Sequence, residues 1–315
     1  MRVLFAAPED AWGGAFDKFR QALPDMEFVA ASDYQTASLA GFDAMIPTMT
    51  RVDATLLQSA DRLKLIQQSG AGLEGVDIGA AQRLGVPVAN VPTDTSGNAD
   101  SVAELAIYMM LALARRASTI PDHFRRRQWG HPSGLALSGK TVGLVGVGGI
   151  GKALAKRLTA FDMRIIGLKR HLTPEFAGQH HLSWLGGPDQ LADLLQHSDF
   201  VVLSLPDNPS THHMINSDTL AQMKAGSFLI NVGRGGLVDK NALERALASG
   251  HLGGAGLDVF WQEPPNPEDT IFNHNLIATP HIGGVTDRSL AGIISAVCDN
   301  LRRLQRGEPL LYLAS

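Results

Sequence analysis

Three polar side chains in the second half of the chain have the types and spacing that acid–base chemistry requires. Arg234, Glu263 and His281 each follow one of three successive apolar segments that predict buried strands. Imidazole titrates near neutral pH, and a carboxylate on its far nitrogen, for which Glu263 is the candidate, would stabilise the imidazolium of His281. Arg234 offers a planar fork for a carboxylate or a polarised carbonyl. Taken singly, each could be an ordinary loop residue. In a doubly wound sheet, however, the carboxyl ends of the strands line one crevice, where we expect all three to converge.

A glycine-rich segment, 146–151, matches the pattern G-x-G-x-x-G. It lies between an apolar strand pattern and an amphipathic helix pattern, which is the context that dinucleotide binding needs. Gly146 permits the tight turn, Gly148 lets the backbone approach a pyrophosphate, and Gly151 allows the helix to pack closely on the strand. The amides and dipole of the helix N-terminus then stabilise the anion, whereas the alternative is a glycine-rich connection without a ligand. The residues predicted to bind the cofactor here are Gly146, Gly148, Gly149, Ile150 and Gly151.

The residues after the next predicted strand, 164–168, bear on the choice of cofactor. A site for NAD usually carries Asp or Glu about 20 residues beyond the first glycines, where it accepts from the ribose hydroxyls. Here the chain has Lys169 and Arg170, and the nearest acids are Asp162 and Glu175. Two cations can pair with a 2′-phosphate that a carboxylate would repel. We therefore predict that NADP(H) is favoured, with NAD(H) as the alternative if the two cations are merely solvated.

The elements that must hold these residues alternate between apolar strands and helices, which predicts parallel sheets with helices on both faces. Strands are predicted at 3–7, 28–31, 44–46, 63–67, 88–91, 142–146, 164–168, 200–205, 228–232, 254–259 and 276–278. Helices are predicted at 15–23, 78–84, 101–118, 152–160 and 287–306. Because the helix at 101–118 has few polar positions on any face, we expect it to be buried between two domains.

These patterns predict an α/β fold of two doubly wound parallel-sheet domains with a cleft between them. We expect a flavodoxin-like substrate domain formed by residues 1–98 together with 285–315. Residues 99–284 are predicted to form a Rossmann domain that binds the dinucleotide.

Composition narrows the class of protein. The chain has 315 residues, a net charge of -4 and 44% hydrophobic residues, which is typical of a globular enzyme and gives no basic field for nucleic acid or membrane surfaces. The single cysteine, Cys298, lies in an apolar helical pattern and predicts a core residue in a reducing compartment. The apolar run at 1–7 is too short for a signal peptide, and no segment approaches a membrane span, so we expect a cytoplasmic protein. The histidine pairs at 180–181 and 212–213 lack further ligands at metal spacing and predict solvated loops, not a metal site.

Several segments resemble motifs of the D-isomer-specific 2-hydroxyacid dehydrogenase family, and together they span nearly the whole chain. They are 69–77, 98–105, 231–239, 256–260 with Glu263-Pro264, and 279–284. The resemblance implies that Arg234, Glu263 and His281 are the catalytic residues, with Arg234 and His281 also binding substrate. It implies that Asp258 hydrogen-bonds the nicotinamide carboxamide.

The resemblance implies further contacts and a partner. On the cofactor side it indicates Asn98, Ser101, Leu205 and Pro206; on the substrate side it indicates Gly70, Ala71 and Gly72, through their exposed backbone. The helix after Ser101 and the irregular basic stretch at 125–132 resemble the dimer-forming region of the family. A homodimer is therefore expected.

The activity that the resemblance implies is hydride transfer between NAD(P)H and a small 2-keto acid, giving a D-2-hydroxy acid. The basic ribose position and the short chain look most like the glyoxylate/hydroxypyruvate reductase branch. Phosphoglycerate dehydrogenases tend to carry arginines where this chain has Pro47 and Met49 and keeps only Arg51, and the chain ends at Ser315 without room for an appended regulatory domain. Alternatives are a phosphoglycerate or phosphite dehydrogenase of the same family, or a dinucleotide-sensing scaffold.

Overall fold

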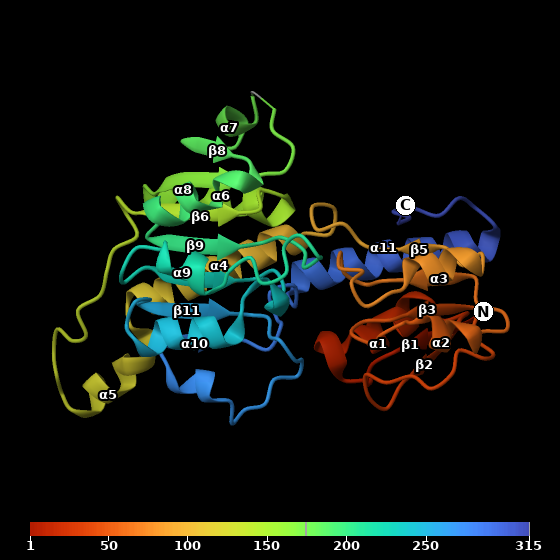
Figure 1. Cartoon of the computed structure of the whole chain (residues 1–315). Helices are drawn as coiled ribbons and strands as arrows, with labels where there is room; N and C mark the ends of the chain where they lie inside the picture. The colour runs from red at the N-terminus through yellow and green to blue at the C-terminus, as the bar shows by residue number, and fades with distance from the viewer. Residues whose placement is uncertain (174, 315) are drawn as a thin grey trace. The chain divides into compact units, whose positions relative to one another are not determined.

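The computed structural model describes residues 1–173 and 175–314 and divides into two compact units (Figure 1). The first unit comprises Met1–Asn98 and Val285–Ser315, and the second comprises Ala99–Gly284. The assignment of the first unit to the substrate and of the second to the dinucleotide stays a prediction. No helix in the described residues is long and apolar enough to cross a membrane.

The first unit contains a five-stranded parallel sheet in the order β2-β1-β3-β4-β5, which is the flavodoxin-like order. The strands are β1 (Arg2–Phe5), β2 (Glu27–Ala30), β3 (Ala44–Ile46), β4 (Leu65–Gln67) and β5 (Val88–Ala89). The helices are α1 (Ala11–Ala22), α2 (Ala54–Gln58), α3 (Ile78–Arg83) and α11 (Asp287–Arg306). Apolar side chains of α1 and α11 bury one face of the sheet, and those of α2 and α3 bury the other. Cys298 lies in the α11 core, where burial raises the pKa of its thiol to about 11, so it is an unreactive core residue.

The second unit contains a seven-stranded parallel sheet in the order β12-β11-β10-β9-β6-β7-β8. Numbered within the unit, this is the Rossmann order 3-2-1-4-5-6 with one more strand at the far edge. The strands are β6 (Thr141–Val145), β7 (Arg164–Leu168), β8 (Trp184–Gly186), β9 (Phe200–Leu203), β10 (Phe228–Asn231), β11 (Gly254–Leu257) and β12 (Leu276–Ala278). The α-helices are α4 (Asn98–Ala114), α5 (Ile120–Arg125), α6 (Gly149–Leu158), α7 (Phe176–Gln179), α8 (Leu191–His197), α9 (Ser217–Ala221) and α10 (Lys240–Ala248). Short 3-10 turns are η1 (Ala117–Thr119), η2 (Thr159–Phe161), η3 (Pro188–Gln190), η4 (Gly235–Leu237) and η5 (Thr270–Asn273).

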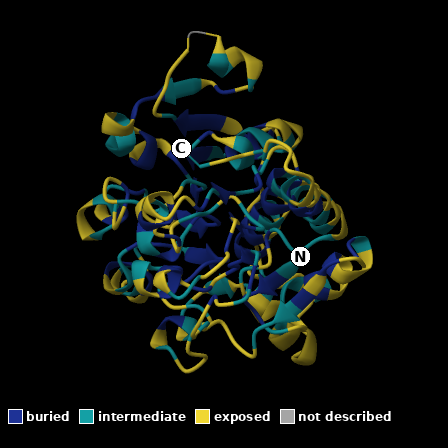
Figure 2. Ribbon diagram, turned by 90° about the vertical axis from the view of Figure 1, so that its right-hand side faces the viewer, coloured by how far each residue is buried: buried dark blue, intermediate teal, exposed yellow. Residues whose placement is uncertain are grey.

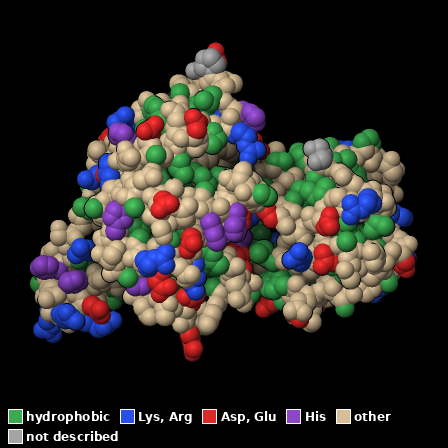
Figure 3. Space-filling view, viewed as in Figure 1, with side chains coloured by type: hydrophobic (Ala, Val, Ile, Leu, Met, Phe, Trp, Pro, Cys, Tyr) green, Lys and Arg blue, Asp and Glu red, His purple; other side chains and the backbone are tan. Residues whose placement is uncertain are grey.

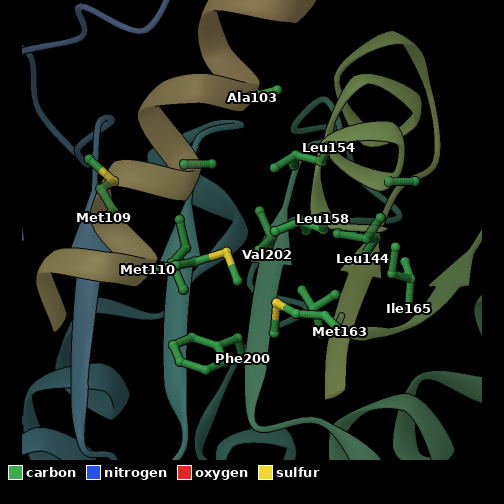
Figure 4. Close-up of a cluster of buried hydrophobic side chains, with 14 of the residues drawn as sticks. Ala103, Met109, Met110, Leu144, Leu154, Leu158, Met163, Ile165, Phe200 and Val202 are labelled. Carbon is green, nitrogen blue, oxygen red and sulfur yellow. The ribbon is translucent and has the colours of Figure 1, made fainter. Parts of the chain in front are cut away.

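Two layers of apolar side chains cover this second sheet. Met110 of α4 and Leu154 of α6 pack with Phe200 and Val202 of β9 on one face (Figure 4). Side chains of α8, α9 and α10 cover the other face. Both sheets are therefore buried centrally beneath their helices, as Figure 2 shows by colour.

The expectation for the helix at 101–118 was wrong in part. α4 ends at Ala114, because Arg116 adopts a left-handed conformation with φ of 52° and stops the helix. One face of α4 is buried against the second sheet, whereas Glu104 is exposed and Tyr108 is 54% exposed. The helix thus has a solvent-accessible face that its low polarity did not predict.

Candidate active site

The glycine loop turns sharply between β6 and α6. Gly146 has φ of 99°, and a Cβ on Gly151 would lie 2.4 Å from the Gly146 carbonyl oxygen, so the fold itself requires glycine at both positions. Gly148 differs, because a Cβ there would meet no heavy atom within 4 Å. Its lack of a side chain leaves open space above the N-terminus of α6, where the backbone amides begin. The residues present therefore fit a pyrophosphate group.

Two further predicted cofactor residues flank this loop. Leu205 follows β9, and its Cβ would be 3.0 Å from a Cβ on Gly146. The carbonyl oxygen of Pro206 accepts a hydrogen bond from Thr211 Oγ1 at 2.8 Å, which fixes the turn that presents Leu205. Ser204, which the sequence did not single out, donates through its hydroxyl to the Gly146 carbonyl at 2.8 Å. A hydroxyl between a strand end and the glycine loop is a signal that could have identified it.

The carboxyl end of β7 carries cations. Lys169 directly follows the strand, and its Nζ donates to the Val147 carbonyl oxygen at 3.4 Å. The same Nζ lies 4.7 Å from the ring centroid of Phe176. Arg170 is exposed. Lys169 is thus held beside the glycine loop, where the ribose of a bound dinucleotide would lie.

His281 and Glu263 form a direct pair. His281 Nδ1 lies 2.7 Å from Glu263 Oε2, and the other carboxylate oxygen accepts from the Phe260 amide at 2.9 Å. Their side chains are 29% and 17% exposed, so the pair borders solvent without being immersed in it. Burial raises the pKa of Glu263, but the hydrogen bond and charge of His281, the Phe260 amide and the Arg234 guanidinium together hold it below the ordinary carboxyl value. An ionised carboxylate only accepts, so Nδ1 of His281 carries a proton in this pair.

Asp258 shapes the loop that carries His281. The residue is 3% exposed, and its carboxylate accepts from Thr279 Oγ1 at 2.7 Å, from the Ile282 amide at 2.8 Å and from the Gly283 amide at 2.9 Å. Burial raises the pKa of Asp258, against the opposing effect of these hydrogen bonds and of the His281 charge. His281 has φ of 54°, a conformation that non-glycine residues rarely adopt. Asp258 therefore holds the histidine loop in place, and a contact with the nicotinamide carboxamide stays a prediction.

Arg234 lies at the carboxyl end of β10 in a loop closed by Asn231. The buried Asn231 side chain accepts from the Gly233 amide at 3.0 Å and donates to the Arg234 carbonyl at 2.8 Å. Arg234 Nη1 donates to the Gly233 carbonyl at 2.7 Å. A Cβ on Gly235 would lie 2.1 Å from the Phe260 carbonyl oxygen, so the arginine loop packs directly on the loop that supplies Glu263.

The sheet brings the three predicted catalytic residues to one edge. β10, β11 and β12 are hydrogen-bonded neighbours, and Arg234, Glu263 and His281 follow them in turn. The arrangement provides a proton-carrying imidazole, a carboxylate that orients it and a cation whose charge acts on that carboxylate. Asn231 and Thr279 were missed in the sequence, although both lie at strand ends beside predicted site residues.

The other predicted residues lie elsewhere on the two units. Gly70, Ala71 and Gly72 form the loop after β4 in the first unit, where Asn90 Nδ2 donates to the Ala71 carbonyl at 2.8 Å. The first residue of α4 is Asn98, and Ser101 is 5% exposed on the same helix. The structure therefore gathers the acid–base residues within the second unit and leaves the predicted carboxylate loop in the first.

The histidine pairs are only partly as predicted. His212 is exposed and its Nδ1 lies 3.1 Å from Asp207 Oδ1, as a solvated loop residue can. His180 is half-buried, with its ring centroid 4.4 Å from that of Phe176, so the expectation of solvation was wrong for it. Packing of α7 onto the sheet face is the reason, since Phe176 joins the core there. Within residues 1–173 and 175–314, no three His, Cys, Asp or Glu side chains gather as metal ligands would.

Comparison with known proteins places this geometry in context. A sequence model described as the NAD binding domain of D-isomer specific 2-hydroxyacid dehydrogenases matches residues 107–283. A glyoxylate reductase from Thermococcus litoralis is 38% identical over 276 residues, covering 84% of this chain and 81% of the relative. A D-3-phosphoglycerate dehydrogenase from Methanocaldococcus jannaschii is 35% identical over 261 residues, covering 82% of this chain and 49% of the relative. The chain thus spans about half the length of that relative.

A solved structure extends the comparison to the whole fold. The NADPH-dependent glyoxylate/hydroxypyruvate reductase from Sinorhizobium meliloti, in complex with NADP and malonate, superposes with a TM-score of 0.85 at 28% identity. The alignment covers 100% of this chain and 96% of that one.

Proposed function

The chain belongs to the D-isomer specific 2-hydroxyacid dehydrogenase family, and from that membership we propose that it reduces a small 2-keto acid to the D-2-hydroxy acid with NADPH. The observation that carries the proposal is the hydrogen-bonded pair of His281 and Glu263 beside Arg234, on the sheet edge where β10, β11 and β12 end. The glycine loop after β6 belongs to the same sheet and supports a dinucleotide as the second reactant.

The proposed mechanism divides the work among the three side chains. A bound nicotinamide supplies the hydride for the carbonyl carbon, so negative charge develops on the carbonyl oxygen. His281 donates a proton to that oxygen from Nε2, while Glu263 holds Nδ1 and stabilises the imidazolium. Arg234 binds the substrate carboxylate or the polarised oxygen through its planar fork, which fixes the carbonyl against the imidazole. In the reverse direction His281 accepts the proton.

The preference for NADPH is argued from the carboxyl end of β7. Lys169 is fixed by Val147 and Phe176 at the place where the adenosine ribose lies in this fold, and Arg170 follows it with an exposed side chain. Neither residue would accept a hydrogen bond from a ribose hydroxyl, and both can pair with a 2′-phosphate. The structure in complex with NADP from Sinorhizobium meliloti supports the choice, and NAD(H) is the alternative.

Glyoxylate or hydroxypyruvate is the substrate that we propose. The alignment with this chain covers about four fifths of the glyoxylate reductase from Thermococcus litoralis. It covers only about half of the phosphoglycerate dehydrogenase from Methanocaldococcus jannaschii. In the loop after β3, Met49 is 42% exposed in the stretch where phosphoglycerate dehydrogenases tend to carry arginines. Arg51, two residues further on, is exposed and could bind a phosphate. A phosphoglycerate substrate is the second candidate, and Arg51 is the residue that favours it. The substrate loop at Gly70, Ala71 and Gly72 is proposed to bind the common carboxylate.

We further propose a cytoplasmic homodimer. Phe124 of α5 is 76% exposed and Trp129 is 86% exposed, and the exposed arginines at 125–127 lie between them in the sequence. The cationic side chains of this segment gather at the lower left of Figure 3. Large aromatic residues flanked by arginine are typical of protein interfaces, so a second copy of the chain is the partner proposed for this segment. A single buried thiol, Cys298, suits a reducing compartment.

The first test is a grid of initial rates. NADPH and NADH oxidation would be measured with glyoxylate, hydroxypyruvate, pyruvate, phenylpyruvate and 3-phosphohydroxypyruvate, and phosphite would be tried as a donor to NADP⁺ and NAD⁺. We expect the largest kcat/KM for NADPH with glyoxylate or hydroxypyruvate. A preference for NADH would contradict the cofactor proposal alone. A preference for the phosphorylated substrate would favour Arg51, and no turnover with any pair would overturn the enzyme proposal.

A variant of the proposed acid links those rates to the site. Because His281 has φ of 54°, Asn is the replacement of choice, since it tolerates that conformation better than Ala. We expect His281→Asn to lower kcat by about 10²- to 10⁴-fold with little change in NADPH binding. His197→Asn, an exposed histidine on α8, is the matched control and should leave kcat unchanged. Equal loss in both variants would remove His281 from the mechanism.

A further inference from the structure

Lys169, Phe176 and His180 are in contact at the end of β7, and the charge of Lys152 acts on His180; we call these four side chains the β7 cluster. Phe176 lies at its centre, with Lys169 Nζ 4.7 Å from its ring centroid and the His180 ring centroid at 4.4 Å. Lys152 is in the first turn of α6, directly after the glycine loop. Lys169 reaches that loop through its 3.4 Å bond to the Val147 carbonyl oxygen. The cluster thus connects α7 to the loop proposed to bind the dinucleotide.

The two lysines give the β7 cluster a positive charge. Among residues 1–173 and 175–314, neither Lys152 nor Lys169 has a carboxylate within ion-pairing distance. Glu175 is the one acid in the sequence from 169 to 181, and it is exposed at the start of α7. Burial, then the charges of Lys152, Lys169 and the adjoining His181, lower the pKa of His180. Lys152 and Lys169 therefore disfavour the imidazolium of His180 in the free protein, and an anion bound beside them would favour it.

The position of the cluster identifies the anion. In a Rossmann fold the adenosine ribose lies at the carboxyl end of the second strand, which is β7 here. We infer that His180 is part of a subsite for the 2′-phosphate of NADP(H) and takes up a proton when that phosphate binds. This inference rests on the proposed preference for NADPH, and it assigns a role to a histidine for which the proposed reaction has no use.

The sign of the resulting pH dependence follows from the charges. A phosphate dianion beside His180 favours the imidazolium and offsets the repulsion from Lys152 and Lys169, so the pKa of His180 is higher in the complex than in the free protein. Phosphate binding is then strongest at low pH and weakens as pH rises through the pKa of the complex. Below about pH 6 the 2′-phosphate itself gains a proton, so the effect is read between pH 7 and 8.5.

The experiment uses two probes that contain no nicotinamide. Adenosine 2′,5′-bisphosphate carries the 2′-phosphate and 5′-AMP does not, and both are titrated by calorimetry into the protein with residues 1–315. Repeating each titration in buffers of different ionisation enthalpy counts the protons taken up. We expect proton uptake with the bisphosphate and none with 5′-AMP. We also expect the Kd of the bisphosphate to rise by about three- to fivefold from pH 7 to 8.5, with a flat profile for 5′-AMP.

Substitutions then test whether His180 is the group that takes up the proton. His180→Gln should abolish both the uptake and the pH dependence. His180→Lys, which places a permanent cation there, should bind the bisphosphate as tightly as the wild type at pH 7 and lose the pH dependence. His181→Asn is the adjoining control, chosen because His181 has φ of 59°, and should keep both properties. The wild-type proton count does not depend on any variant folding.

The outcomes separate this inference from the proposed function. If the bisphosphate binds more tightly than 5′-AMP, and Lys169→Met removes that difference, the preference for NADPH is supported. If under those conditions proton uptake is absent, or persists in His180→Gln, the role of His180 is refuted and the NADPH proposal stands. If the wild type binds both probes equally, both proposals fail.

Discussion

Glu263→Gln separates the charge of the carboxylate from its shape. Glutamine has nearly the same size, and its remaining oxygen can still accept the 2.9 Å hydrogen bond from the Phe260 amide. Its NH₂ group would then face His281 Nδ1 in place of the carboxylate oxygen that now lies 2.7 Å away. A donor at that position cannot accept from the imidazolium, so the variant should fold with its loop in place and lose the stabilised acid.

The size of the loss follows from the hydrogen bond that is removed. A hydrogen bond between charged partners contributes about 1.5–3 kcal/mol. Because the side chains of His281 and Glu263 are 29% and 17% exposed, solvent screens the pair and the lower half of that range applies. With 1.4 kcal/mol per factor of ten, we expect kcat for keto-acid reduction to fall by about 10- to 40-fold at pH 7.

The assay is kcat with NADPH and hydroxypyruvate from pH 5.5 to 9. Glu268→Gln changes an exposed glutamate five residues away and is the matched control, with an expected effect below about twofold. In the His281→Asn background, Glu263→Gln should add less than about twofold, because the carboxylate acts through the imidazole. A Glu263→Gln enzyme that matches the wild type at every pH, or a full additive loss in the double variant, would refute this reasoning.

The lowered pKa of Glu263 also gives a stability test with a defined sign. A carboxyl group whose pKa is lower in the native state stabilises that state when ionised. This contribution is present above the ordinary value of 4.5 and is lost as pH falls through the lowered pKa. The free energy of unfolding of the wild type should therefore exceed that of Glu263→Gln at pH 7, and the two should converge in acid. Urea denaturation at several pH values measures both.

Three further substitutions test the loops around the site. Gly148→Ala should change the free energy of unfolding by less than about 0.5 kcal/mol and weaken NADPH binding by about tenfold or more, because its Cβ enters open space; a clear loss of stability would mean that the fold itself needs this glycine. Gly235→Ala should lower the free energy of unfolding by about 2–3 kcal/mol, since its Cβ would lie 2.1 Å from the Phe260 carbonyl oxygen, and a wild-type urea midpoint would contradict that contact. Thr279→Val removes the 2.7 Å bond to Asp258 and should cost about 1–2 kcal/mol and lower kcat more than it raises the KM for NADPH; unchanged kcat would show that this bond does not position the histidine.

Much of the secondary structure could be predicted from the sequence, because the patterns that indicate it are local. The strands Ala44–Ile46, Arg164–Leu168 and Leu276–Ala278 and the helix Asp287–Arg306 were predicted with the bounds that the structure has. Each is an apolar run or a 3.6-residue periodicity closed by turn residues, and such patterns need no knowledge of distant contacts. β8 (Trp184–Gly186) was missed because three residues at a sheet edge are too few for a period to be visible.

The sequence predicted which residues form the site, but it did not predict the contacts that support them. Arg234, Glu263 and His281 could be predicted because each follows a predicted strand and has a side chain suited to acid–base chemistry or anion binding. The bonds of Asp258 to the loop of His281 span up to 25 residues, and no spacing rule reports them. The half-buried position of His180 could not be predicted for the same reason, since it depends on tertiary packing around α7, where its ring contacts Phe176. Side-chain environment is a property of tertiary packing, which a motif does not encode.

Contacts behind the three site residues hold their loops in place, and one of these contacts lowers the stability of the fold. Asn231 closes the loop of Arg234, the Phe260 amide holds Glu263, and Asp258 holds the loop of His281. Each support is buried or part of the backbone, so it acts by fixing a rigid loop on a strand end. Because Asp258 keeps a buried carboxylate whose desolvation opposes its ionisation, the loop is held at a cost in stability. Asp258→Asn should therefore reduce kcat far more than it reduces the free energy of unfolding, and the opposite ratio would mark Asp258 as a residue of the fold alone.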